Sequence, residues 1–526
     1  MDTDTIAKLK LDRAALDRAR ISRDARFDGR FFIGVRSTRI YCRPICPAPS
    51  PKPGNIRYFS TAAAAAEAGF RPCLRCRPEA APASPAWLGV SAVVRRALRL
   101  IEEGALDEAS VSELAARLGI GERHLRRLFV QHVGAAPLAV AQTRRLHFAK
   151  RLIDETNLSM TEVALASGYG SVRRFNAAFR STYGRAPTDL RRRGRAAKPR
   201  DGIVLRLSFR PPYDWPGMLQ FLAARAVAGM ELVEGNRYLR TIEVGEKPAS
   251  IAVGRANGMD ALEFEVRGVV PVALFNLVAR ARRMFDLSLD PVRLDLAYGR
   301  DRLLAPLAAR YQGLRIPGVW DGFEGAVRAV LHEGSIEREQ TLVARLVRSC
   351  GARLKAADLR VASLTRLFPT ARAVAAADLA ADGFSQSQIL RLRALAAAVA
   401  DGSIDFNAPS DEFMRALVRV QGIDESTAHY IALRALGEPD AFPADDPVLQ
   451  RQARLYRGAQ SLADVAKAWR PWRAYAALML WRADAERHPG VTTTARSPIS
   501  RRPRRGGDER SVSSPDPRTN LPVGAD

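Results

Sequence analysis

The 526-residue chain has only five cysteines, few aromatic side chains and no long hydrophobic run. Because no stretch of about 18 apolar residues occurs, we expect no membrane-spanning helix and no membrane partner. The N-terminal segment is charged and lacks the apolar centre of a secretory signal, which predicts a cytoplasmic protein. Nothing in the sequence implies an oligomer.

Positive charge is the strongest compositional feature of the chain. It contains 82 Lys and Arg against 56 Asp and Glu, which gives a formal net charge of +26. Such an excess favours a polyanionic partner, and neutralising phosphates is its usual purpose. A genome rich in G and C also favours Arg and Ala, so charge alone leaves both explanations open.

The length exceeds what one hydrophobic core supports, so several domains are expected. Hydrophobic spacing of three and four residues predicts helices in two long regions, and alternating residues near 203 predict strands between them. We therefore expect a multidomain, mainly α chain: a small α/β domain (1–82), an all-α domain (86–193), an α+β subdomain (203–300), an all-α domain (301–488) and a disordered tail (489–526).

Four of the five cysteines lie between positions 42 and 76. The spacings Cys42-x3-Cys46 and Cys73-x2-Cys76 form two knuckles, each of which can offer two thiolates to one tetrahedral Zn²⁺. A purely structural zinc site has the same spacing, so spacing does not decide between a structural and a chemical role. Basic neighbours can screen the negative charge of such a site and reach DNA phosphates: Arg43, Arg71 and Arg75.

The sequence segments around the cysteines carry more information than the cysteine spacing. FDGRFFIGVRSTRIYCRPICP, NIRYF and AGFRPCLRC resemble the N-terminal domain of Ada-type DNA repair and response proteins over some 75 residues. The resemblance implies transfer of a methyl group from DNA methylphosphotriesters to Cys42, with Cys46, Cys73 and Cys76 as the remaining zinc ligands. Methylation would remove one negative charge from the site and should strengthen binding to phosphates.

Two helix-turn-helix patterns follow, at 110–129 and 159–187. GYGSVRRFNAAFRSTYGRAP in the second closely resembles the AraC-type DNA-binding domain, which implies double-stranded promoter DNA as a partner at the nucleoid and RNA polymerase as a further one. Two amphipathic hairpins with solvated basic faces are the alternative. The side chains expected to face DNA are Arg123, Arg126, Arg127, Arg173, Arg174 and Asn176.

The C-terminal half contains a second recognisable pattern. LVRVQGIDESTAHYIALRALGEPDAFPADDPVLQR (417–451) predicts a helical hairpin followed by a loop with two carboxylates. With PPYDWPGMLQFLAARAV and WRPWRAYAALMLW, it resembles AlkA-type 3-methyladenine DNA glycosylases of the helix-hairpin-helix superfamily. The backbone of such a hairpin, here at Gly422, can face a DNA phosphate, and its carbonyls can hold a monovalent cation.

This resemblance implies hydrolytic excision of alkylated purines from a flipped nucleotide. Asp446 matches the catalytic carboxylate, although an Asp445–Asp446 pair is more often a helix cap or a solvated loop. Phe221, Tyr430 and Trp481 match the aromatic residues of the substrate pocket, and ordinary core packing is their plainer interpretation.

Four positions depart from the glycosylase pattern. Asp424 replaces the second glycine of the hairpin, and Ser426 and Pro447 replace pocket aromatics. Gly334 stands where the wedge that fills the gap left by a flipped base is expected. The sequence thus leaves open a working repair enzyme, a methylation-switched activator with an inactive glycosylase half, and a plain zinc-stabilised DNA-binding protein. The fifth cysteine, Cys350, is interpreted as a buried helix residue.

Overall fold

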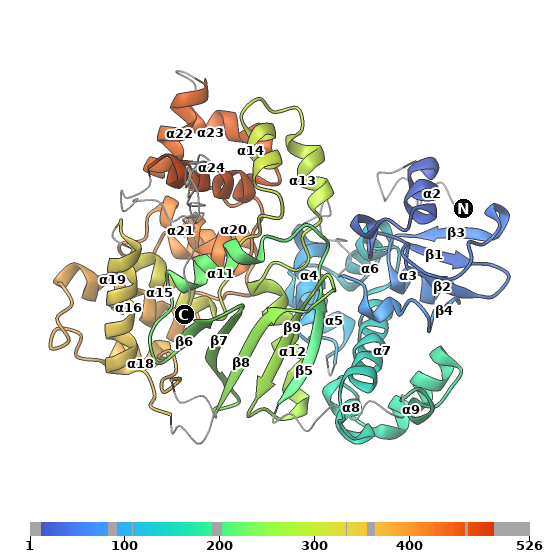
Figure 1. Ribbon diagram of the computed structural model, residues 1–526. Helices are drawn as coiled ribbons and strands as arrows, with labels where there is room; N and C mark the ends of the chain where they lie inside the picture. The colour runs from blue at the N-terminus through green and yellow to red at the C-terminus, as the bar shows by residue number, and fades with distance from the viewer. Residues whose placement is uncertain are drawn as a thin grey trace, which may run out of the picture.

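The computed structural model describes residues 12–82, 92–107, 109–191, 202–332, 334–354, 363–457 and 461–488. The expected disordered tail, 489–526, lies outside the described residues. The described parts form a cysteine-bearing domain, a set of helices, a central sheet and a larger helical domain (Figure 1). The prediction of a multidomain, mainly α chain with small sheets is confirmed.

The N-terminal domain is built on a four-stranded sheet in the order β3-β1-β2-β4. Strand β1 pairs antiparallel with β2 and β3, whereas the short β4 pairs in parallel with β2. Alternate residues of β1 face opposite sides of the sheet, so Phe32 and Ile33 join two separate apolar clusters. The elements are α2 (Arg13–Ile21), β1 (Phe32–Val35), β2 (Ile40–Cys42), β3 (Ile56–Phe59), α3 (Ala62–Glu67) and β4 (Arg71–Pro72), with 3-10 turns η1 (Ala25–Phe27), η2 (Pro53–Asn55) and η3 (Pro78–Ala80).

The next part is helical, with one long helix, α7, between two helix-turn-helix units. The first helix of each unit begins with a capping box, Ser110 with Glu113 and Ser159 with Glu162, which satisfies the free N–H groups of its first turn. The helices are α4 (Ala92–Glu102), α5 (Val111–Arg117), α6 (Glu122–His132), α7 (Pro137–Glu155), α8 (Met160–Ala166), α9 (Val172–Tyr183) and α10 (Pro187–Leu190).

A five-stranded antiparallel sheet in the order β5-β9-β8-β7-β6 occupies the centre of the molecule (Figure 1). Its apolar side chains pack against α11 and α12. The elements are β5 (Ile203–Ser208), α11 (Trp215–Ala223), β6 (Glu231–Glu234), β7 (Arg237–Val244), β8 (Lys247–Arg255), β9 (Ala261–Arg267), η4 (Pro271–Ala273) and α12 (Leu274–Met284).

The C-terminal domain is a helical bundle around the largest apolar core of the described residues. Helices α20 and α21 form the predicted hairpin, and a π-helical turn, η5, continues α21. The elements are α13 (Pro291–Tyr298), α14 (Leu304–Arg310), α15 (Gly322–Leu331), α16 (Ile336–Cys350), α18 (Ala371–Ala376), α19 (Gln386–Ala400), α20 (Ser410–Leu417), α21 (Glu425–Ile431), η5 (Ala432–Leu436), α22 (Pro447–Arg457), α23 (Leu462–Val465), η6 (Ala466–Trp469) and α24 (Arg473–Arg487).

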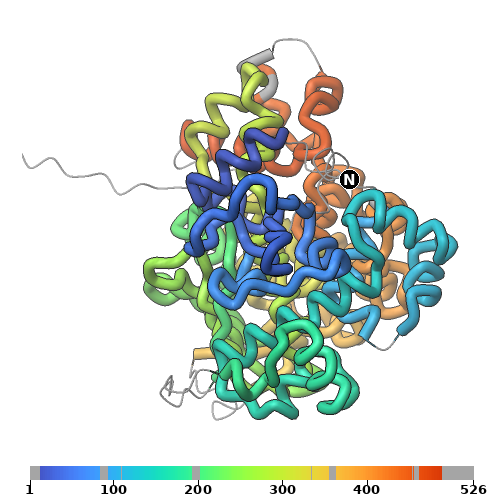
Figure 2. Tube along the Cα trace, turned by 90° about the vertical axis from the view of Figure 1, so that its right-hand side faces the viewer, coloured from blue at the N-terminus to red at the C-terminus, as the bar shows by residue number. Residues whose placement is uncertain are grey.

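The N-terminal domain, the helix-turn-helix part and the central sheet pack against one another. Phe148 of α7 makes an edge-on contact with Phe275 of α12, with ring centroids 4.8 Å apart, so one core spans the helix-turn-helix part and the central sheet. Buried Arg30 in the N-terminal domain pairs with buried Asp290 at 2.9 Å. In Figure 2 the N-terminal domain lies over the rest, flanked by the two helix-turn-helix units. No described helix is long and apolar enough to cross a membrane.

Candidate metal centre, DNA-binding helices and buried carboxylate

The four clustered cysteines converge on one point of the N-terminal domain. Cys42 ends β2, and Cys73 follows β4, where its N–H donates to the carbonyl oxygen of Tyr41 at 3.0 Å. With Cys46 and Cys76, their Sγ atoms all lie within 4.8 Å of one another. Cys73 and Cys76 are buried, whereas Cys42 and Cys46 are half-buried and therefore closer to solvent.

This arrangement fits one Zn²⁺. Zn–S distances of about 2.3 Å in a tetrahedron place sulfur atoms roughly 3.8 Å apart, and the four Sγ atoms all lie within 4.8 Å of one another. Hydrogen bonding between the thiols of Cys42 and Cys46 raises the pKa of Cys42 and lowers that of Cys46 to about 7. A divalent cation removes such competition for protons by holding all four groups as thiolates. The prediction that the four cysteines are placed to bind one metal ion is confirmed.

Arg43, one of the three basic residues expected near phosphate, is held inside the domain. Its Nε donates to Asp28 Oδ1 at 2.8 Å, and its Nη2 pairs with the other carboxylate oxygen. Its Nη1 donates to the carbonyl oxygen of Cys76 at 3.0 Å, and its backbone N–H donates to Cys76 Sγ at 3.3 Å. Arg43 therefore supports the metal centre from behind, while Arg71 and Arg75 are exposed.

The second helix of each helix-turn-helix unit has one apolar and one basic face. In α6, Leu125 and Phe129 are buried, and in α9, Phe175 and Phe179 are buried. Arg126 pairs with Glu122 at 2.7 Å, which orders one basic side chain of α6. The exposed basic side chains are Arg123, Arg126, Arg127, Arg173 and Arg174, whereas Asn176 is half-buried.

The hairpin between α20 and α21 depends on Gly422. Its φ of +82° suits glycine, and a Cβ at this position would lie 2.4 Å from Arg391 Cγ. Asp424 is exposed and caps α21, because its Oδ1 accepts from the N–H of Thr427 at 2.7 Å. The carboxylate thus occupies the N-terminal end of α21.

Asp446 is 6% exposed, whereas its neighbour Asp445 is exposed. Asp446 Oδ1 accepts from the backbone N–H groups of Val448 and Leu449, each at 3.0 Å, at the start of α22. It also accepts from Trp481 Nε1 at 3.1 Å. The carboxylate is therefore a helix cap and is also fixed by an aromatic side chain from α24. Within the described chain, no hydrogen bond to Oδ2 is found.

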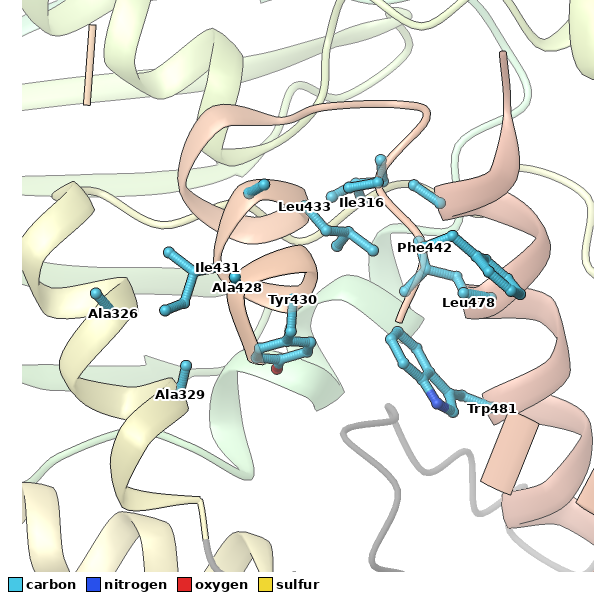
Figure 3. Close-up of a cluster of buried hydrophobic side chains, with 14 of the residues drawn as sticks. Ile316, Ala326, Ala329, Ala428, Tyr430, Ile431, Leu433, Phe442, Leu478 and Trp481 are labelled. Atoms are coloured by element: carbon cyan, nitrogen blue, oxygen red, sulfur yellow. The ribbon is translucent and has the colours of Figure 1, made fainter. Parts of the chain in front are cut away.

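The three predicted pocket aromatics are all buried and come from three different helices. Tyr430 of α21 and Trp481 of α24 meet edge to face, with centroids 6.1 Å apart, beneath an apolar cluster (Figure 3). Phe221 of α11 joins them indirectly, because Arg434 lies over both its ring and that of Tyr430, at 4.5 and 5.6 Å. The structure thus connects the three aromatics, and Trp481 alone of the three donates a hydrogen bond to Asp446.

Two arginines near these aromatics were missed by the sequence analysis. Arg434 donates to the Tyr430 hydroxyl at 2.7 Å, and Arg225 lies over the Phe221 ring at 4.0 Å. Each arginine follows its aromatic by four residues, the spacing of neighbours on one helix face. The four-residue spacing in the sequence could therefore have predicted both contacts. Cys350, interpreted as buried, is in fact half-buried, because it ends α16 where packing is incomplete.

The sequence matches three family models. They describe the metal-binding domain of Ada (15–79), a helix-turn-helix domain (114–193) and the AlkA N-terminal domain (204–321). Residues 15–79 contain all four clustered cysteines, and 204–321 contain Phe221 and Arg225.

Three relatives show how these domains combine. A protein of Mycobacterium tuberculosis named probable bifunctional transcriptional activator/DNA repair enzyme AlkA is 39% identical over 480 residues, covering 88% of this chain and 95% of that protein. DNA-3-methyladenine glycosylase 2 of Escherichia coli is 35% identical, over 52% of this chain and 95% of that enzyme. The bifunctional transcriptional activator/DNA repair enzyme Ada of Escherichia coli is 37% identical, over 25% of this chain and 35% of that protein.

The resemblances to Ada-type, AraC-type and AlkA-type proteins are therefore borne out along successive parts of one chain. The relative from Mycobacterium tuberculosis aligns through all of them at once. The chain belongs to the family of bifunctional transcriptional activators and DNA repair enzymes in which an Ada-type metal-binding domain and a helix-turn-helix domain are fused to an AlkA-type glycosylase.

Proposed function

We propose that this chain detects and repairs alkylated DNA in two ways. Its N-terminal domain takes a methyl group from a DNA methylphosphotriester onto Cys42, and its C-terminal half hydrolyses the N-glycosidic bond of alkylated purines. The methylated form then activates promoters through α6 and α9. The observation that carries this proposal is the convergence of four thiols at the end of β2, with Cys42 half-buried, in a chain of this family.

In the first reaction, Cys42 Sγ attacks the methyl carbon of the phosphotriester. The S–CH₃ bond forms as the O–CH₃ bond breaks, and the phosphate oxygen keeps the bonding electrons as a phosphodiester. Zn²⁺, when bound, keeps the four sulfurs deprotonated and electron-rich. Arg43 holds Cys76 in place through two hydrogen bonds, while exposed Arg71 and Arg75 are placed to attract the DNA backbone. Methylation of the Cys42 thiolate removes one negative charge from the metal centre, and this loss strengthens binding to the DNA phosphates.

Transfer of a labelled methyl group tests the first reaction. The zinc-loaded full chain is incubated with DNA carrying ¹⁴C-methylphosphotriesters and then digested, and the label is mapped to peptides. We expect one methyl group per chain, on Cys42, and the same result in Cys350→Ser. Label on Cys350, or no label on any cysteine, would contradict the proposed acceptor.

In the second reaction, Asp446 stabilises the positive charge that develops on the sugar as the bond to the base breaks. Three N–H groups converge on Oδ1, which fixes the carboxylate and leaves Oδ2 to face the sugar. The electrons of the broken bond leave with the base. Water adds to the sugar carbon and loses its proton to solvent. The burial of Asp446 and its contact with Trp481 support this role over that of an ordinary helix cap.

A second function is favoured by the hairpin itself. The carboxylate of Asp424 caps α21 and repels a phosphate at that helix end, and Gly334 has no side chain to fill the gap left by a flipped base. On this alternative, the C-terminal half binds DNA without excision, and the protein is a methylation-switched activator alone. Base release by the full chain separates the two alternatives.

A further inference from the structure

A cavity of about 260 Å³ lies where the three parts of the fusion meet. Its wall includes Thr61 and Glu79 from the N-terminal domain, residues of α4 and α7, and residues of α12. Ligand sites commonly measure roughly 300–1,000 Å³, and this cavity lies just below that range, so it suits only a small molecule. Neither α9 nor the helical hairpin nor Asp446 lines it, so it is separate from the sites described above.

Part of the cavity lining is apolar. Helix α7 contributes Phe148, which is 5% exposed, and α12 contributes Phe275, which is 8% exposed. Aliphatic side chains from three helices complete this wall, which can accept a hydrocarbon or aromatic body. They are Leu98, Ile101, Val140 and Val278.

The lining is also strongly positive, and the Arg144 guanidinium lies over the Phe275 ring at 3.3 Å. Arg144, Arg151 and Arg282 line the cavity, and within the described chain none of the three forms an ion pair with a carboxylate. Their bonds go to backbone carbonyl oxygens instead: Arg151 Nη2 donates to Arg206 at 2.5 Å, and Arg282 Nη1 to Ser208 at 3.4 Å. Burial lowers the pKa of Arg144 to about 9 and that of Arg282 to about 10.

Two of these guanidinium groups still have unused donors. Arg151 is 91% buried, and its Nε has no hydrogen-bond partner. Arg282 Nη2 is also buried without a partner. A buried donor without an acceptor destabilises the protein, so each of these groups favours an incoming acceptor.

Two carboxylates also line the cavity, and neither satisfies these donors. Glu79 is paired elsewhere, with Arg77 at 3.3 Å and Lys150 at 3.7 Å. Desolvation raises the pKa of Glu102, and the charges of Arg144 and Arg282 only partly oppose that rise. The lining therefore keeps a net positive charge, even with both carboxylates ionised.

We propose that this cavity binds a small organic acid, whose anionic group is held by Arg151 and Arg282 and whose apolar body lies against Phe148 and Phe275. The shared chemistry is an oxyanion on a hydrocarbon or aromatic group. His147 also lines the cavity, and its Nε2 is 2.8 Å from the hydroxyl of Tyr41, the residue before Cys42. The bound acid thus bridges α7 and α12 and stabilises their packing, and His147 connects the cavity to the N-terminal domain through Tyr41.

Calorimetric titration of the zinc-loaded full chain with 2-naphthoate tests the proposal, and 2-naphthamide serves as the uncharged match. We expect naphthoate to bind at least about tenfold more tightly than the amide, as expected for a charge-assisted hydrogen bond. Equal affinity of the two compounds, or no saturable binding of naphthoate, would overturn the proposal. This comparison needs only the unmodified protein.

Two variants then locate the site. Arg151→Gln removes the charge, and Ala279→Phe fills the cavity from α12, so each should weaken naphthoate binding at least about tenfold. The matched controls are Arg237→Gln, at an ion-paired arginine whose side chain is 42% exposed, and Val270→Phe, at an exposed valine, and both should keep the original affinity. Unchanged naphthoate affinity in Arg151→Gln and Ala279→Phe would place the ligand elsewhere and refute the proposed cavity.

Discussion

We expect zinc retention to depend on Asp28, which contacts Arg43 and none of the four clustered cysteines. Asp28 holds the guanidinium of Arg43 through both carboxylate oxygens, and Arg43 in turn donates to the backbone oxygen and the Sγ of Cys76. Asp28 is only 4% exposed. If its negative charge is removed, water therefore cannot reach the guanidinium of Arg43 to balance the positive charge. The backbone oxygen of Asp28 also accepts from buried Arg210 at 2.8 Å, which ties the loop to the central domain.

We expect Asp28→Asn to weaken zinc binding by about 10–100-fold, the usual effect of losing an outer partner of a metal ligand. This corresponds to about 1.4–2.7 kcal/mol of binding free energy. The amide keeps the shape of the side chain but cannot balance the charge of Arg43. Arg43 then moves toward solvent, and Cys76 loses the donors that orient it.

Competition with a chromogenic chelator under reducing conditions measures the zinc affinity of the folded full chain. Asp24→Asn is the matched control, because Asp24 also pairs with an arginine, Arg26, at 2.6 Å, but has no contact with the cysteines. The control should stay within about twofold of the unmodified protein. Equal zinc affinity in Asp28→Asn and the unmodified protein would refute the argument that Arg43 is a support of the metal centre.

Three further predictions test other parts of the molecule. Gly422→Ala should lower the melting temperature more than Gly402→Ala. Both glycines have a φ of +82°, but only a Cβ at Gly422 would clash with Arg391. Equal losses of stability in the two variants would refute the clash. Burial raises the pKa of Asp286 from its usual 3.8 to about 6, so its stabilising contribution is full well below pH 4 and is lost as the pH rises through 6. Urea unfolding should show the stability of the unmodified protein relative to Asp286→Asn falling by about 2 kcal/mol from pH 4 to pH 7, and a constant difference would contradict this. Arg123→Ala in α6 should weaken promoter binding in a fluorescence-anisotropy titration and reduce the slope of log affinity against log salt concentration by about 1. Arg310→Ala, the control, should change neither the affinity nor the slope. An unchanged slope in Arg123→Ala would exclude a phosphate contact.

The metal centre could be predicted from sequence because its ligands lie in two short knuckles. The mainly α class with small sheets was also predictable, since helix and strand periodicities are local. The capping boxes at Ser110 and Ser159 show this, because each involves residues only three apart.

Contacts between distant segments were not predictable. Arg210 donates to the backbone of Asp28, 182 residues away, and no local pattern announces such a bond. For the same reason, Arg43 was expected at the DNA surface, whereas its carboxylate partner turns it inward. The cavity shared by three parts likewise arises only from their packing.

Base release from methylated DNA by the full chain and by Asp446→Asn tests the repair claim most directly. The substituted amide still accepts the N–H groups of Val448 and Leu449, so folding should be retained. Asp445→Asn, at the exposed neighbour, is the matched control. The account predicts release of 3-methyladenine by the unmodified chain and the control, and at least about 100-fold slower release by Asp446→Asn. No release by the folded unmodified chain, or equal release by Asp446→Asn, would contradict it.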